Sequence, residues 1–89
     1  MVDHSAKEEE ESAFRTTALE QPGVLDVELL RTRMFGNRVY VDLEIAADPA
    51  LTLAEAHGIA ERVHDAIEQA YPDVKHIMVH VNPAKDQGI

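Results

Sequence analysis

The strictest pattern in the sequence is an alternation of apolar and polar residues over residues 37–48. Its apolar positions are spaced two apart, at Val39, Val41, Leu43 and Ile45. This spacing is typical of a strand that buries one face and leaves the other open. A Gly36-Asn37 turn signal precedes the run, and Asp48-Pro49 ends it, because proline cannot donate to a central ladder. We therefore expect a half-buried strand whose open face carries Asp42 and Glu44.

Two further runs have the same period. Residues 24–34 lie just before the Gly36-Asn37 turn, which predicts an antiparallel hairpin with Leu29 on the core face and Leu30 on the open face. Residues 74–82 also alternate, and the more polar face of this run carries His76, Met78 and His80. The sequence therefore predicts three strands.

Two segments have helical signals. The first begins at Ser5 or Ser12 and ends before Pro22-Gly23. The second begins with the capping box Thr52-x-x-Glu55 and continues with an apolar stripe at helical spacing. The order is α-β-β-α-β, and a strand-helix-strand crossover normally joins parallel strands. The expected fold class is α+β, a reduced ferredoxin-like sandwich with a three-stranded mixed sheet and two helices on one face.

Charge and composition exclude several classes of function. The 89 residues suffice for one small domain, and eight basic against seventeen acidic residues give a net charge of −9. Such a surface repels nucleic acids and anionic membranes and attracts cations. The sequence has no cysteine, no apolar run long enough to span a membrane, no nucleophile motif and no phosphate-binding loop. We expect a soluble cytoplasmic protein that is not an enzyme.

The open face of the predicted sheet gathers residues that can ligate a metal. It carries Glu28, Asp42 and His80, one from each strand. Carboxylate oxygen and imidazole nitrogen suit zinc and other divalent transition metals. The alternative is an ordinary solvated sheet face. His57, on the rim of the second helix, is likewise either a surface residue or a ligand.

Two long segments of the sequence resemble a known family. They are "QPGVLDVELLRTRMFGNRVYVDLEI" and "LTLAEAHGIAERVHDAIEQAYPDVKHIMVHVNP", with a PGV entry, L-R-T-R before a glycine turn, E-A-H near the helix start and a closing V-H-V-N-P. In this order they resemble the cytoplasmic C-terminal domain of cation diffusion facilitator transporters. The resemblance implies a metallochaperone-like fold and a V-shaped homodimer whose arms close when a divalent metal binds near the dimer interface and the sheet face.

The resemblance also implies a set of ligands. The family's ligand positions fall at Asp42, His57 and His80, and a histidine of some zinc transporters falls at Glu28. An aspartate that often follows the last histidine by two residues is Asn82 here, a neutral and weaker ligand. The expected metal is zinc, bound by Asp42 and His80, with Glu28 beside them or contributed by a second subunit. His57 is expected at a peripheral site that water or an acidic residue completes.

We expect residues 1–11 to be an acidic, flexible leader, residues 12–83 to be the domain, and residues 84–89 to be a tail. The family's transmembrane domain has no counterpart in this sequence, which suits either a free-standing protein or an excised fragment. The expected function is a homodimeric zinc-binding module for regulation, sensing or buffering. The alternative is a metal-independent association module that pairs with itself or with a membrane cation transporter.

Overall fold

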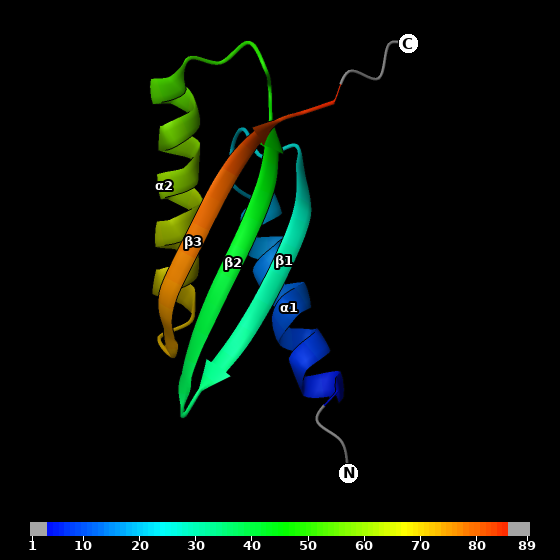
Figure 1. The fold of residues 1–89 in the computed structure, drawn as a ribbon, viewed down its shortest axis with the longest axis vertical. Coiled ribbons are helices and arrows are strands. Elements are labelled where there is room, and N and C mark those ends of the chain that lie inside the picture. The colour runs from blue at the N-terminus through cyan, green and yellow to red at the C-terminus, as the bar shows by residue number, and fades with distance from the viewer. Residues whose placement is uncertain (1–3, 86–89) are drawn as a thin grey trace.

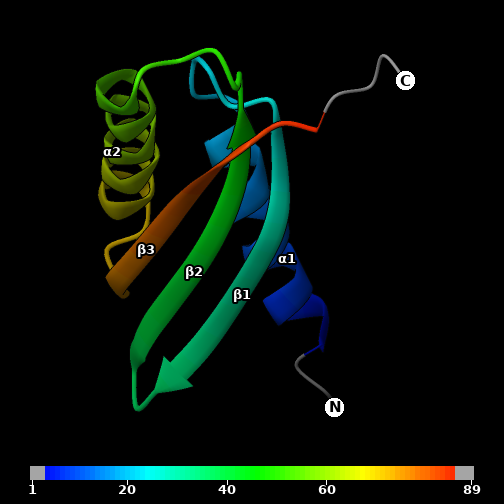
Figure 2. The same cartoon turned by 45° about the horizontal axis from the view of Figure 1, so that its top comes forward.

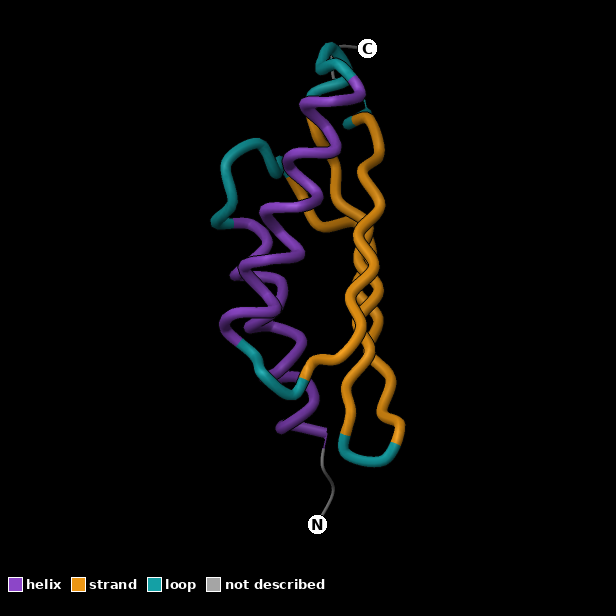
Figure 3. The backbone as a smooth tube through the Cα atoms, turned by 90° about the vertical axis from the view of Figure 1, so that its left-hand side faces the viewer, coloured by secondary structure: helices purple, strands orange, loops and turns teal. Residues whose placement is uncertain are grey.

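The computed structural model describes residues 4–85, which form two layers (Figure 1). The elements are α1 (His4–Leu19), β1 (Asp26–Phe35), β2 (Arg38–Ala47), α2 (Leu53–Ala70) and β3 (Val74–Pro83). The sheet has the order β1-β2-β3, in which β2 pairs antiparallel with β1 and parallel with β3. Both helices lie on the same side of the sheet (Figure 3). The predicted α+β class, with a three-stranded mixed sheet and both helices on one face, is confirmed.

The hydrophobic core lies between the sheet and the two helices. Figure 2 shows α2 beside β3 and α1 behind β1 and β2. The largest fully buried side chains come from all these layers: Phe14 of α1, Val63 and Ile67 of α2, and Val41, Leu43 and Ile45 of β2. Within residues 8–85 every buried side chain is apolar. The polar side chains of these residues therefore lie at or near the surface.

A β-bulge in β1 changes which residues face the core. The pairing with β2 shifts between Val27 and Leu29, so Glu28 is an extra residue that has no partner in β2. After the bulge, Leu30 lies opposite the buried Leu43, and Leu29 lies on the outer face. The predicted inward Leu29 and outward Leu30 are therefore wrong, because one inserted residue reverses every face that follows it.

The predicted hairpin turn and the predicted helix cap are both present. Gly36 has a φ of 64° and is the first of two residues that join β1 to β2. A positive φ at that position alone is the signature of a type II′ hairpin turn. At the start of α2, the Glu55 amide donates to Thr52 Oγ1 at 3.1 Å and the Thr52 amide donates to Glu55 Oε1 at 2.9 Å. The capping box is confirmed and fixes where the helix begins.

The first helix begins before the domain boundary that we expected from the sequence. α1 begins at His4, so it includes residues 4–11, most of the segment that we expected to be a separate leader. Residues 1–3 and 86–89, the ends of the expected leader and tail, lie outside the described residues. The domain boundaries at residues 12 and 83 stay predictions.

Candidate metal centre

The strand pairing arranges the outer side chains of the sheet in rows. One row is Arg31, Asp42 and Met78, and the next is Leu29, Glu44 and His80. Asp42 and His80 therefore share a face but stand in adjacent rows, roughly 7 Å apart along the strands. The residue directly across from His80 is Glu44.

Asn82 joins two carboxylates at one end of this face. Its amide nitrogen Nδ2 donates to Glu28 Oε1 and to Glu44 Oε1, each at 3.1 Å. The three side chains come from three different strands, and Glu28 is the bulged residue of β1. We call Glu28, Asp42, Glu44, His80 and Asn82 the sheet-face cluster. It is rich in oxygen ligands and has one imidazole.

The cluster is accessible to ions from solvent. Asp42 and Glu44 are half-buried, whereas Glu28 and His80 are exposed. Arg31 lies across from Asp42, yet within the described residues no ion pair joins the two. The Asp42 carboxylate is therefore not committed to that guanidinium.

A single copy of the chain does not complete the cluster as a metal site. Within the part of the chain that the structure describes, three ligating atoms of His, Asp or Glu come together only at His64, Asp65 and Glu68. The ligating atoms of Asp42, His80 and Glu28 are thus farther apart than a metal shell allows. A metal on this face needs side-chain movement or ligands from a second copy.

His57 lies apart from the sheet-face cluster. It belongs to α2, which packs on the opposite side of the sheet (Figure 3). Its Nε2 is 3.3 Å from Glu61 Oε2, and the two side chains are 71% and 67% exposed. The structure therefore gives His57 an acidic neighbour of its own but does not bring it to Asp42 or His80.

Sequence reasoning missed two residues here. Glu44 follows Asp42 by two, so alternation alone puts it on the same face, but only the pairing of β2 with β3 shows that it opposes His80. Glu61 follows His57 by four, the spacing of neighbours on a helix, and this signal was available in the sequence.

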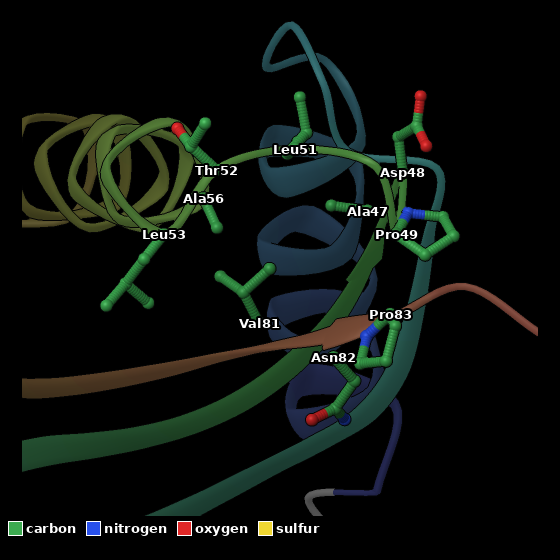
Figure 4. Close-up of a pocket in the computed structure, with 10 residues that line it drawn as sticks. All are labelled: Ala47, Asp48, Pro49, Leu51, Thr52, Leu53, Ala56, Val81, Asn82 and Pro83. Carbon is green, nitrogen blue, oxygen red and sulfur yellow. The ribbon is translucent and has the colours of Figure 1, made fainter.

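A hollow at the start of α2 includes Asn82 of the sheet-face cluster in its lining (Figure 4). It has a volume of about 260 Å³, and its lining includes Leu51, Leu53, Val81 and Pro83. Its one titratable side chain is Asp48, whose Oδ1 accepts from the Ala50 amide in the preceding turn. A hollow with a single, structurally engaged carboxylate lacks the paired groups that acid–base catalysis requires.

Comparison with known proteins identifies the family. The model of the family described as "Cation efflux protein, cytoplasmic domain" matches residues 6–84. The chain belongs to this family. Metal tolerance protein C1 of Arabidopsis thaliana is 31% identical over 94% of the chain, and cation-efflux pump FieF of Pectobacterium atrosepticum is 32% identical over 93%. The chain spans only 18% and 27% of the length of these two relatives.

Solved structures show the same fold. MamM CTD residues 215–293 align with a TM-score of 0.85 and 28% identity, covering 88% of this chain and 99% of that one. A MamM CTD variant described as a nickel form aligns with the same TM-score and 27% identity, covering 88% and 99% of the two chains. The resemblance to the C-terminal domain of cation diffusion facilitators is therefore confirmed. No helix among the described residues is long and apolar enough to cross a bilayer.

Proposed function

We propose that this chain is a homodimeric, cytoplasmic regulatory module that binds a divalent metal, with zinc as the expected ion. The observation that carries the proposal is the sheet-face cluster, in which three strands bring carboxylates and an imidazole to the face that no helix covers. These are the oxygen and nitrogen ligands that zinc and nickel accept. Asp42 and His80 are the central ligands, and Glu28 and Glu44 lie beside them.

The mechanism follows from the incompleteness of one protomer. Because the ligating atoms of one chain do not close around an ion, a second copy supplies the remaining ligands. The bound cation neutralises carboxylates that face each other across the dimer and stabilises the closed arrangement by its higher affinity for it. The matched family supports a role beside a membrane cation transporter, and the nickel form of MamM CTD supports a divalent ion. The matched family is a domain of cation efflux proteins and not an enzyme class, which supports a non-catalytic role for the module.

Calorimetric zinc titration, with mass measured by sedimentation, tests this proposal. The double variant Asp42→Ala/His80→Ala should bind fewer zinc ions at saturation than the unmodified dimer, because the ions held on the sheet face are lost. The matched control Asp73→Ala/His76→Ala also removes one carboxylate and one imidazole, but from outside the cluster, and should bind as many as the unmodified dimer. Equal zinc binding by the unmodified chain and the Asp42/His80 variant would refute the assignment.

A second candidate function is metal-independent association. It is favoured by an exposed apolar strip on the same outer face, where the Phe35 and Tyr40 ring centroids are 4.7 Å apart. Tyr40 in turn stacks on His76 at 5.3 Å, and Met78 is 44% exposed. This version of the module should dimerise equally well in a strong chelator, whereas the metal-dependent module should change its sedimentation when zinc is removed.

A further inference from the structure

A stripe of alternating imidazoles and carboxylates runs along the exposed side of α2. His57, Glu61, His64 and Glu68 are spaced four, three and four residues apart, which places them on one side of the helix. The first pair is joined by the 3.3 Å contact between His57 Nε2 and Glu61 Oε2. The second pair lies about two turns, roughly 10 Å, further along the helix. A single ion cannot bridge the two pairs.

The second pair has a third ligating neighbour. His64 Nδ1 is 3.2 Å from Asp65 Oδ1, and the ligating atoms of His64, Asp65 and Glu68 all lie within 4.8 Å of one another. No other trio of histidine and acidic side chains among the described residues is gathered this closely. The His64 side chain is 41% exposed and therefore partly held by its surroundings, whereas Asp65 is 65% exposed and free to adjust.

The spacing of these atoms is near that of a metal shell. Ligand bonds of about 2.0–2.2 Å in a tetrahedron place neighbouring ligand atoms about 3.3–3.6 Å apart. The two carboxylates therefore need to move inward by only an ångström or so. One imidazole nitrogen, two carboxylate oxygens and a water make four ligands, and the two carboxylates balance the charge of a divalent ion.

The position on the helix independently points to a cation. Glu68 lies in the last turn of α2, where the helix macrodipole is negative and carboxylates are disfavoured. This last turn contains no basic residue. A cation held by Asp65 and Glu68 would supply the positive charge that this helix end lacks.

We propose that His64, Asp65 and Glu68 form a second, independent site for a divalent transition-metal ion on the helical side of the molecule. The site goes beyond the proposed function, because it needs neither the sheet-face cluster nor a second copy of the chain. It gives each protomer a metal-binding capacity of its own and stabilises the end of α2.

Histidine-resolved NMR tests this site with zinc chloride as the probe. The imidazole Cε1–Hε1 signal of His64 should shift and saturate during titration of the full chain, including in the Asp42→Ala/His80→Ala background. Glu68→Gln should raise the zinc concentration at half-saturation by at least about tenfold, since even indirect partners of a metal cost that much when removed. The matched control Glu20→Gln, which removes an exposed carboxylate elsewhere, should leave it unchanged.

Two results would overturn the site. One is a His64 signal that moves no further than that of His76. The other is half-saturation within twofold of the unmodified chain in both Glu68→Gln and Asp65→Asn, which would mean that a lone histidine binds the ion. Both substitutions change exposed side chains and leave the core intact, so the amide spectrum should show folded protein in each case.

Discussion

Replacing Asn82 by aspartate should lower the folding stability of the chain and raise its affinity for metal. The Asn82 amide donates to carboxylates of both β1 and β2, and thereby separates two like charges. Asn82→Asp removes both donors and adds a third negative charge to the same spot. The variant Asn82→Ala removes the donors without adding charge, so the difference between the two variants isolates the repulsion.

The magnitudes follow from the contacts. Hydrogen bonds to charged groups contribute about 1.5–3 kcal/mol each to folding stability when they are shielded from water. Because Glu28 is exposed, we expect the two hydrogen bonds of Asn82 together to contribute about 1 kcal/mol. Two new carboxylate pairs at about 5 Å in a near-aqueous dielectric add about 1 kcal/mol each. We expect Asn82→Ala to lose about 1 kcal/mol and Asn82→Asp about 3 kcal/mol. For a domain of this size each kcal/mol lowers the Tm by about 4–8 °C.

Thermal unfolding followed by circular dichroism measures both effects. In chelator at neutral pH, the order of Tm should be unmodified chain, Asn82→Ala, then Asn82→Asp. Excess zinc should raise the Tm of Asn82→Asp more than the Tm of the other two proteins. An ion that binds only the folded state, at a concentration about 100 times its Kd, adds about 2.7 kcal/mol to the free energy of unfolding. If Asn82→Asp melts at or above Asn82→Ala in chelator, the carboxylates are not gathered as described.

Three further predictions concern the core, a turn and pH. Gly23→Ala should lower the free energy of unfolding, measured by chemical denaturation, by about 1–3 kcal/mol, and Gly36→Ala should lower it less. Both glycines have a positive φ, but only at Gly23 would a Cβ lie 2.6 Å from Ile59 Cδ1. Ile67→Ala should lower the free energy of unfolding by about 2–5 kcal/mol, because Ile67 is fully buried. In the same assay Leu53→Ala should change it by no more than about 0.5 kcal/mol, because the Leu53 side chain is 87% exposed. Zinc affinity measured by calorimetry should fall as the pH is lowered, because protons compete with zinc for histidine ligands. An affinity that does not change with pH would argue for carboxylate ligands alone.

Local signals in the sequence predicted most of the fold. Apolar alternation in β2, the glycine turn and the Thr52–Glu55 capping box are properties of a few adjacent residues, and each is present in the structure. The bulge at Glu28 was not predictable, because a single inserted residue leaves the strand's composition unchanged and shows only in its pairing with β2. This is why Leu29 and Leu30 were assigned to the wrong faces.

The sequence predicted which face of the sheet carries the candidate site, but not which of its residues are neighbours across the strands. Alternation alone placed Asp42 and His80 on the open side of the sheet. Which acid opposes His80 depends on the register between two parallel strands, which is set by the packing of the whole α2 crossover. Glu44 therefore emerges as the cross-strand neighbour of His80 only from the structure. The Asn82 bridge likewise depends on three strands meeting.

Anomalous diffraction at the zinc absorption edge, from crystals of the full chain grown with zinc, tests the central claim most directly. The account predicts an anomalous peak on the outer face of the sheet, between Asp42 and His80 and close to a second copy of the chain. A zinc-saturated crystal with no peak on that face, whether or not α2 holds an ion, would contradict it.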